Sequence, residues 1–286
     1  NKGYERVTIN IPIFNKDEIF LKYKKIYFSA FFEGIYYGAY SFDYFKKEKE
    51  KTSVKEVVFI NADTQYMSSI HKQVQIIMES VYFSRDLINL PGNIITPHEL
   101  AHRTIEKTRE AKIDVAVLGE DELIQRGLNG IMSVGRASVN QPRLILLHCN
   151  PGLSDLKKIA LVGKAVTYDA GGLSLKPTES MLDMKIDMSG GAVVIGAILA
   201  AAKLELPVEI IAVVPAVENV ISGNAFKPGD IIRTYSGKSV EIRDTDAEGR
   251  LILADSIEYI STQHPEIIID IATLTGGCVV GLGEFI

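Results

Sequence analysis

Short apolar runs alternate with helical patterns from about residue 113 onward, and this alternation is what most constrains the fold. The runs lie at 113–118, 144–148, 159–162, 208–214 and 267–271. Helical patterns occur at 121–126, 190–204 and 251–262. Strands that are apolar along their whole length, with helices between them, are typical of a parallel sheet covered on both faces. We therefore predict an α/β fold with a mostly parallel sheet flanked by helices.

The first 66 residues differ from the rest, because they are rich in Lys, Phe and Tyr. Strands are predicted at 7–13 and 57–60, helices at 16–23 and 30–40, and a solvated loop at the charged run 46–56. We expect residues 1–66 to form a smaller α/β domain that precedes the one with the main sheet.

A long helix is predicted to join the two domains. Apolar residues recur at three- and four-residue steps from 68 onward, and Leu90-Pro91-Gly92 is a strong stop signal. We assign residues 67–90 to this linker and 91–286 to the second domain. Thr96-Pro97-His98-Glu99 has the form of a capping box with proline at the first helical position, so another helix is expected to run to about residue 111.

Charge and cysteine content exclude several classes of protein. The net charge is −5, and the lysine-rich run 46–55 is interleaved with Glu, so we do not expect nucleic-acid binding. Cys149 and Cys278 do not have CxxC spacing, which argues against a disulfide framework or a thiolate zinc site. The longest apolar run, 190–202, is too short to span a bilayer. We expect a cytoplasmic protein without a membrane segment.

Histidines offer no recognisable metal motif. None of the five forms HExxH, and His98 and His102 read as a pair on a helix surface. A metal site in this chain would therefore use oxygen ligands or an unusual nitrogen.

Three segments carry such ligands. In the first, an apolar strand leads to Lys164, then Asp169, a glycine pair and Lys176; surface lysines on a loop are the alternative. In the second, Asp187 precedes a helix of small residues and could instead be its N-terminal cap.

The third segment runs from 244 to 251. Thr245 and Glu248 fit a capping box, but three carboxylates in five residues exceed what a cap needs, and they repel one another unless a cation neutralises them. Gly249 is a poor helix residue, and Arg250 is a donor suited to a small oxyanion. Because ligands bind outside the carboxyl ends of the strands in such sheets, these segments together predict a site for two divalent ions.

The same segments resemble those of the M17 leucyl aminopeptidases. Residues 244–251 (DTDAEGRL) are similar to the family octapeptide NTDAEGRL, and 162–177 are similar to VGKGITFDSGGLSLKP. Residues 184–192, 224–230 and 271–276 also match in order, so the resemblance covers residue 68 to the end. It implies a metal-dependent aminopeptidase that removes N-terminal residues, preferably Leu, by a two-metal mechanism with metal-activated water.

The resemblance also implies residue roles. The metal ligands would be Lys164, Asp169, Asp187, Asp246 and Glu248; the catalytic residues Lys176 and Arg250; and the substrate-binding residues Met184, Thr273 and Leu274. Lys164 would ligate as the neutral amine, which requires a lowered pKa. Lys176 would stabilise the substrate carbonyl oxygen, and Arg250 would anchor bicarbonate as the general base. The ions expected are Mn²⁺ or Zn²⁺, with Mg²⁺ and Co²⁺ as alternatives, and the intact protein would be a homo-hexamer.

Two other functions stay open. Some relatives act as DNA-binding accessory or regulatory proteins, and family members continue well beyond the LTG motif, so the chain reads as incomplete at both ends and could be an inactive fragment. The chain also departs from the family pattern at Asp244 (usually Asn), Ala170 (usually Ser) and Ala165 (usually Gly), none of which removes a proposed ligand.

Overall fold

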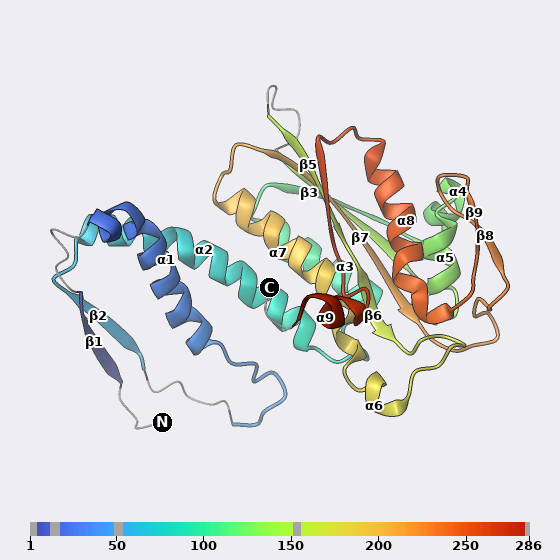
Figure 1. Cartoon of the computed structure of the whole chain (residues 1–286), viewed down its shortest axis with the longest axis horizontal. Helices are drawn as coiled ribbons and strands as arrows, with labels where there is room; N and C mark the ends of the chain where they lie inside the picture. Colours follow the sequence, from blue (N-terminus) through green and yellow to red (C-terminus); the bar gives the residue numbers. More distant parts are fainter. Residues whose placement is uncertain (1–4, 12–17, 49–53, 151–155, 284–286) are drawn as a thin grey trace. The chain divides into compact units, whose positions relative to one another are not determined.

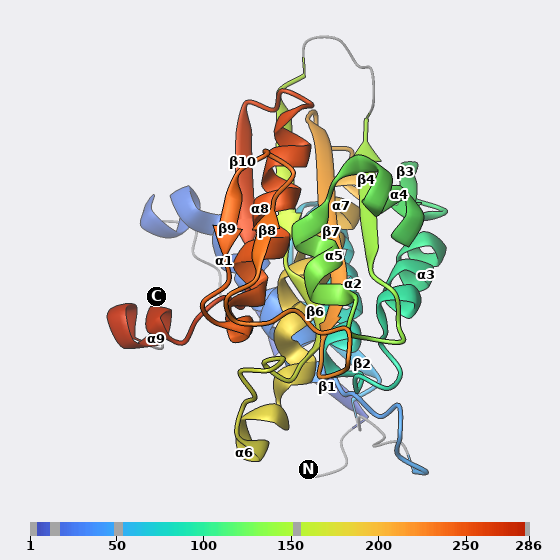
Figure 2. The same cartoon turned by 90° about the vertical axis from the view of Figure 1, so that its right-hand side faces the viewer.

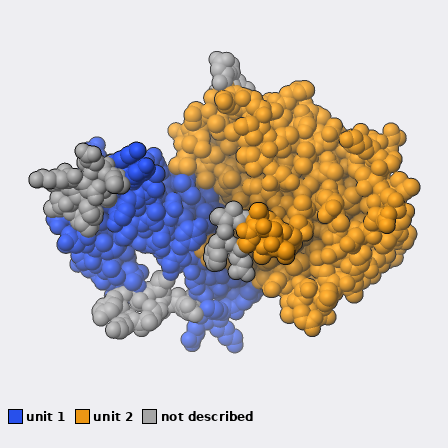
Figure 3. Space-filling model, in the orientation of Figure 1, with its two compact units in different colours: residues 1–82 blue, residues 83–286 orange. Residues whose placement is uncertain are grey.

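The computed structural model describes residues 5–11, 18–48, 54–150 and 156–283, with side chains described from residue 22 onward in the first helix. The chain divides into two compact units, residues 1–82 and 83–286 (Figure 3). Each unit has its own apolar core, so each is described by itself.

The first unit combines a parallel pair of strands with helices. The strands are β1 (Arg6–Asn10) and β2 (Glu56–Ile60), and the first helix is α1 (Glu18–Ala39). Phe28, Phe32 and Met78 are buried in its core. The two helices predicted at 16–23 and 30–40 are one continuous helix, because the residues between them include no Gly or Pro to break it. Part of the predicted loop 46–56 lies outside the described residues, and its last residue begins β2.

The predicted linker helix is α2 (Thr64–Asn89), and the boundary between the units falls within it. Our domain limits at 66 and 91 stay predictions, as does the assignment of the first unit as a separate α/β domain. The second unit then begins with α3 (Pro97–Thr108), where the Thr96 hydroxyl accepts a hydrogen bond from the Glu99 backbone N–H at 3.3 Å. The Glu99 carboxylate itself pairs with Arg103 at 2.7 Å.

The main sheet of the second unit has six strands. Its order is β10 (Ile267–Ile271), β5 (Lys158–Gly163), β7 (Glu209–Asn219), β4 (Arg143–Cys149) and β3 (Ile113–Leu118), with β6 (Ala165–Asp169) pairing β7 beyond the end of β5. β10, β5, β6 and β7 pair in parallel, whereas β4 is antiparallel to both of its neighbours. Five strands therefore point the same way, and the predicted mostly parallel sheet is confirmed.

Helices cover both faces of this sheet (Figures 1 and 2). α3 and α7 (Ser189–Lys203) lie on one face, and α4 (Glu120–Arg126), α5 (Asn129–Gly135) and α8 (Glu248–Ser261) lie on the other. Short elements complete the unit: α6 (Thr178–Met181), the 3₁₀ helices η1 (Met184–Met188) and η2 (Thr245–Ala247), the hairpin β8 (Ile231–Arg233) and β9 (Ser239–Glu241), and α9 (Gly277–Leu282).

Among the described residues, one helical segment, Met184–Lys203, is long and apolar enough to cross a membrane by length and composition, but 61% of its apolar 18-residue window is buried inside the protein. That burial is typical of a core helix. On the opposite face, Leu128, Ile131, Val213 and Ile252 pack into one buried cluster between the sheet and the helices.

A buried carboxylate fastens α8 to its neighbours. Asp255 is fully buried, and its two oxygens accept hydrogen bonds from the backbone N–H groups of Gly130 (2.6 Å), Ile131 (3.2 Å) and Tyr235 (2.8 Å). Burial raises the pKa of this carboxyl, although the three donors act in the opposite direction. The start of α5 and the turn after β8 are thereby tied to one side chain.

We predict that Asp255→Asn lowers the free energy of unfolding by about 2–4 kcal/mol, because one oxygen becomes an NH₂ group that faces buried N–H donors. Urea unfolding followed by circular dichroism measures the change. Asp114→Asn, at an exposed position of β3, is the matched control and should change stability by less than about 0.5 kcal/mol. Equal effects of the two substitutions would contradict the structural role of Asp255.

Candidate metal centre

Lys164 lies at the step between β5 and β6. Its backbone N–H donates to the carbonyl of Ile271 at 3.0 Å, and its carbonyl accepts from the N–H of Gly191 at 2.7 Å. These bonds hold the residue where the end of β10 meets the first turn of α7. Since the next strand shifts to pair only with β7, the Lys164 side chain is delivered into the protein at the carboxyl edge of the sheet.

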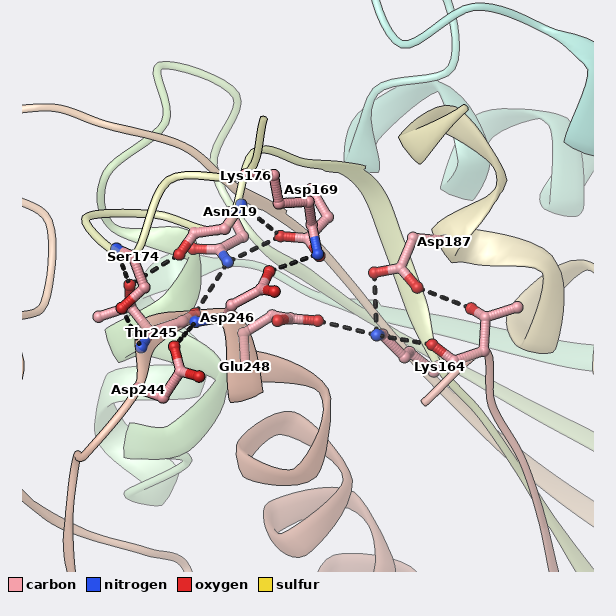
Figure 4. Close-up of polar contacts among 12 residues, drawn as sticks. Lys164, Asp169, Ser174, Lys176, Asp187, Asn219, Asp244, Thr245, Asp246 and Glu248 are labelled. Atoms are coloured by element: carbon pink, nitrogen blue, oxygen red, sulfur yellow. Dashed lines mark hydrogen bonds and ion pairs between the residues drawn. The ribbon is translucent and has the colours of Figure 1, made fainter. Parts of the chain in front are cut away.

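The buried amine of Lys164 is shared between two carboxylates (Figure 4). Its Nζ lies 2.9 Å from Asp187 Oδ2 and 2.8 Å from Glu248 Oε1, and it donates to the carbonyl of Thr273 at 3.1 Å. Asp187 comes from η1, Glu248 is the first residue of α8, and Thr273 follows β10. Four segments that are distant in sequence therefore meet at one amine.

A second lysine repeats this arrangement beside the first. Lys176 Nζ lies 3.0 Å from Asp169 Oδ2 and also pairs with Asp246. Asp169 is the last residue of β6, and Asp246 lies in η2. The side chain of Asp246 is 33% exposed, whereas Asp169 is buried, so this half of the centre is the one that reaches solvent.

The loop between Asp169 and Lys176 turns back on itself through two glycines with positive φ angles, 86° at Gly171 and 65° at Gly172. Glycine adopts this region readily, whereas a side chain would be strained there. The Lys176 backbone N–H then donates to the carbonyl of Ala170 at 3.0 Å. The turn places both charged side chains on the same side of the sheet edge.

Neither capping interpretation from the sequence holds. Asp187 does not cap α7, because its carboxylate is taken up by Lys164 and by the Thr273 hydroxyl, which donates to Oδ1 at 2.7 Å. Thr245 does not cap α8 either. Asp244 instead caps the preceding η2, where its Oδ1 accepts from the N–H of Asp246 at 2.9 Å.

The Thr245 hydroxyl has a different task. It donates to the carbonyl of Gly171 at 2.7 Å and accepts from the N–H of Ser174 at 2.8 Å, and the Ser174 hydroxyl accepts in turn from the N–H of Thr245 at 3.2 Å. Thr245 is fully buried. These three bonds fasten the lysine-bearing loop to the segment that carries Asp246.

Burial and like charge shape the pKa values of the cluster. Burial raises the pKa of Asp187 to about 6 and that of Glu248 to about 7, against the opposing attraction of Lys164. Burial also opposes charge on the Lys164 amine, but Glu248 and Asp187 outweigh it, and the pKa is raised. The lowered pKa expected for Lys164 applies to the amine as a metal ligand, and it stays a prediction. A neutral amine there requires another cation to neutralise the two carboxylates.

The residues fit a divalent cation. The four carboxylates, Asp169, Asp187, Asp246 and Glu248, face two lysine amines, so the cluster carries a formal charge of −2. Asp169, Asp246 and Glu248 each offer an oxygen within 4.8 Å of the other two. Within the described residues, the buried Glu248 Oε2 has no hydrogen-bond partner. Carboxylates with an unsatisfied buried oxygen and excess negative charge form a donor set for a hard divalent ion.

The other predicted residues lie around this centre at varying distances. Thr273 touches it directly through its carbonyl and hydroxyl, and Leu274 lies beside Gly249. Met184 begins η1 and is half-buried. Arg250 is exposed, and no hydrogen bond or ion pair joins it to the cluster in the part of the chain that the structure describes. The metal, catalytic and substrate roles assigned to these residues stay predictions.

Asn219 is a contact residue that the sequence did not indicate. It is the last residue of β7, and its amide donates to Asp169 Oδ1 at 2.8 Å and to the carbonyl of Thr245 at 3.0 Å. The predicted strand ended at 214, so the continuation of β7 to the sheet edge was missed. A polar side chain at the end of an apolar strand was the signal that could have found it.

The Gly249 position explains an anomaly seen in the sequence. A Cβ atom built there would lie 2.8 Å from Lys164 Nζ and 2.9 Å from its Cε. We predict that Gly249→Ala displaces the amine, weakens Mn²⁺ binding at least tenfold and lowers stability, although alanine is favoured over glycine inside a helix by about 0.5–1 kcal/mol.

Gly34→Ala in α1 is the control, because a Cβ there meets nothing within 4 Å. It should raise the free energy of unfolding by about 0.5–1 kcal/mol and leave Mn²⁺ affinity unchanged. Isothermal titration with MnCl₂ and thermal unfolding measure both effects. A Gly249→Ala chain that binds Mn²⁺ like the unsubstituted one would contradict the proposed contact with Lys164.

Known proteins that resemble this chain in sequence belong to one family. The model of the cytosol aminopeptidase family catalytic domain (peptidase M17) matches residues 82–286. Curated relatives named "Probable cytosol aminopeptidase" include those of Chlorobium limicola, 44% identical over 89% of this chain and 53% of the relative, and Rickettsia rickettsii, 39% identical over 97% and 56%. The chain spans about half the length of the curated relatives it matches.

A solved structure described as the bottromycin maturation enzyme BotP in complex with Mn has a TM-score of 0.83 and 32% identity, covering 96% of this chain and 58% of that one. A second BotP structure has a TM-score of 0.80 and 34% identity, covering 91% and 54%. Sequence and structure agree, and the chain belongs to the cytosol aminopeptidase (M17) family.

Proposed function

We propose that the protein of which this chain forms part is an aminopeptidase that hydrolyses the N-terminal residue, preferably Leu, from peptides with the help of two divalent ions. The observation that carries the proposal is the cluster of Asp169, Asp246 and Glu248, whose oxygens lie within 4.8 Å of one another at the carboxyl edge of the sheet. Membership of the family supports peptidase activity. The preference for Leu and the use of two ions are proposed in addition.

Lys164, Asp169, Asp187, Asp246 and Glu248 would hold the ions. Bound divalent ions would supply a Lewis acid and lower the pKa of water towards neutrality. A bound ion would also offer a ligand position to the free, neutral α-amino group of a peptide, which favours action at the N-terminus over action within a chain.

The remaining residues act on the substrate. Lys176, on the more exposed half of the centre, would stabilise negative charge that develops on the substrate carbonyl oxygen. Leu274 and Met184 would present apolar surface to the first side chain, and Thr273 would hold the peptide. Arg250 would bind bicarbonate as the general base, which requires its exposed guanidinium to turn towards the centre.

Manganese is the first ion to test, because the BotP structure is described as a complex with Mn. Zn²⁺ is the alternative, followed by Mg²⁺ and Co²⁺. We further propose a cytoplasmic homo-hexamer that acts on peptides and binds neither nucleic acid nor membranes. An accessory role in DNA binding is disfavoured by the net charge of −5.

We predict that the intact protein, loaded with Mn²⁺ or Zn²⁺, releases p-nitroaniline from leucine p-nitroanilide. The N-acetylated form of the same amide is the control. It lacks the free amino group and should not be cleaved. Absorbance at the p-nitroaniline band measures both rates. If a metal-loaded, folded preparation releases no p-nitroaniline, the proposed peptidase activity is refuted. If it cleaves the N-acetylated amide, the assignment as an aminopeptidase is refuted.

We predict that Lys176→Ala lowers kcat by about 10²-fold or more, since it removes a cation aimed at a developing oxyanion. Mn²⁺ affinity should not fall in parallel with kcat, because the Lys176 amine competes with the ion for Asp169 and Asp246 and its removal leaves both carboxylates available. Lys158→Ala, at the opposite end of β5, serves as the control and should retain both. Parallel loss of kcat and affinity in the Lys176 variant would show that this lysine only maintains the metal site.

A further inference from the structure

Asn219 occupies a position that the sheet itself determines. In the register of the parallel pair β6–β7, it lies directly opposite Asp169, and both residues end their strands. Its backbone carbonyl accepts from the N–H of Ala170 at 2.8 Å. Asn219 is 1% exposed, so its side chain contacts the protein alone.

The contacts of the Asn219 amide fix its orientation. The Nδ2 group donates both to Asp169 Oδ1 (2.8 Å) and to the carbonyl of Thr245 (3.0 Å). Both partners are acceptors, so the NH₂ group must face them and the Oδ1 atom must face away. One side chain thus joins the end of β6 to the residue immediately before Asp246 (Figure 4).

The two oxygens of Asp169 are used differently as a result. Oδ1 accepts from neutral donors only, the Asn219 amide and the N–H of Gly171 at 2.9 Å. Oδ2 is left to face the Lys176 amine. The neutral donors keep the carboxylate from rotating and direct one oxygen towards the cationic part of the centre.

Stability alone is a poor explanation for this asparagine. Its Oδ1 is buried and has no hydrogen-bond partner in the described part of the chain. A buried acceptor without a partner destabilises a fold, and such groups in native proteins call for another explanation. The geometry of the neighbouring carboxylates supplies one.

We infer that Asn219 is a positioning residue for the metal centre, which holds Asp169 and the backbone preceding Asp246 in the single arrangement that binds divalent ions. This inference rests on the proposed metal-dependent function. It assigns to Asn219 no contact with substrate, only the orientation of a ligand.

The test compares two substitutions of the same kind. Asn219→Asp replaces an amide that donates to a carboxylate with a second carboxylate. Asn140→Asp does the same beside a carboxylate that is not part of the metal centre, because Asn140 Nδ2 donates to Glu218 Oε1 at 3.0 Å and to Oε2 at 3.2 Å. Asn219→Ala is the second variant, which removes the donor without adding charge. Thermal unfolding establishes that each variant is folded at the temperature of the assay.

Mn²⁺ affinity by isothermal titration and the electron paramagnetic resonance spectrum of the bound ion are the readouts. We expect both Asn219 variants to bind Mn²⁺ at least tenfold more weakly with an altered spectrum, and Asn140→Asp to stay within twofold with an unaltered one. Affinity and spectrum unchanged in Asn219→Ala, or changed equally in Asn140→Asp, would overturn the inference while leaving the proposed function intact. No Mn²⁺ or Zn²⁺ binding by the unsubstituted chain would overturn both.

Discussion

Lys164 and Lys176 each hold an amine between two carboxylates at the carboxyl edge of the sheet, largely out of water. Burying a charge is unfavourable unless it is paired and hydrogen-bonded, and removing one partner of a buried pair leaves the other uncompensated. The arrangement therefore survives only if every segment that contributes to it arrives in register. Much of the second unit is best understood as the means of bringing those segments together.

The sheet performs most of this work. β5 ends so that Lys164 can enter the protein, β6 continues along β7 to deliver Asp169, and β10 ends where Thr273 reaches Lys164. Because parallel strands end at one edge, residues far apart in sequence converge there without long connections. The start of α8 adds Glu248, and Gly249 leaves the space that the lysine amine occupies.

Sequence patterns predicted the strands and the site residues whose signals lie within a few neighbouring residues. Apolar runs located β3, β4, β5 and β10, and the dense carboxylates drew attention to Asp246 and Glu248. The errors came from features that depend on tertiary contacts. The spacing of Thr245 and Glu248 fits a capping box, but a hydrogen bond to Gly171 across the fold competes for the same hydroxyl. Nothing local distinguishes these two outcomes.

Asn219 was missed for a related reason. The apolar run of β7 was expected to end before Pro215, which has no N–H for a ladder, yet the strand continues past it because its neighbours β4 and β6 supply partners on both sides. Only the pairing of strands shows that the last residue of β7 stands opposite Asp169.

The structure tolerates the departures from the family pattern at Ala170 and Asp244, because the contacts at both positions do not depend on the usual side chain. Ala170 contributes through its backbone, which bonds to Asn219 and Lys176, so a side-chain hydroxyl is not needed there to hold the loop. Asp244 contributes an acceptor for the N–H of Asp246, a task that the oxygen of an asparagine performs equally well. What aspartate adds is a negative charge next to a cluster that already has two more carboxylates than lysine amines. The scaffold is therefore indifferent to this substitution, and its effect falls on the electrostatics of the half of the centre that faces solvent.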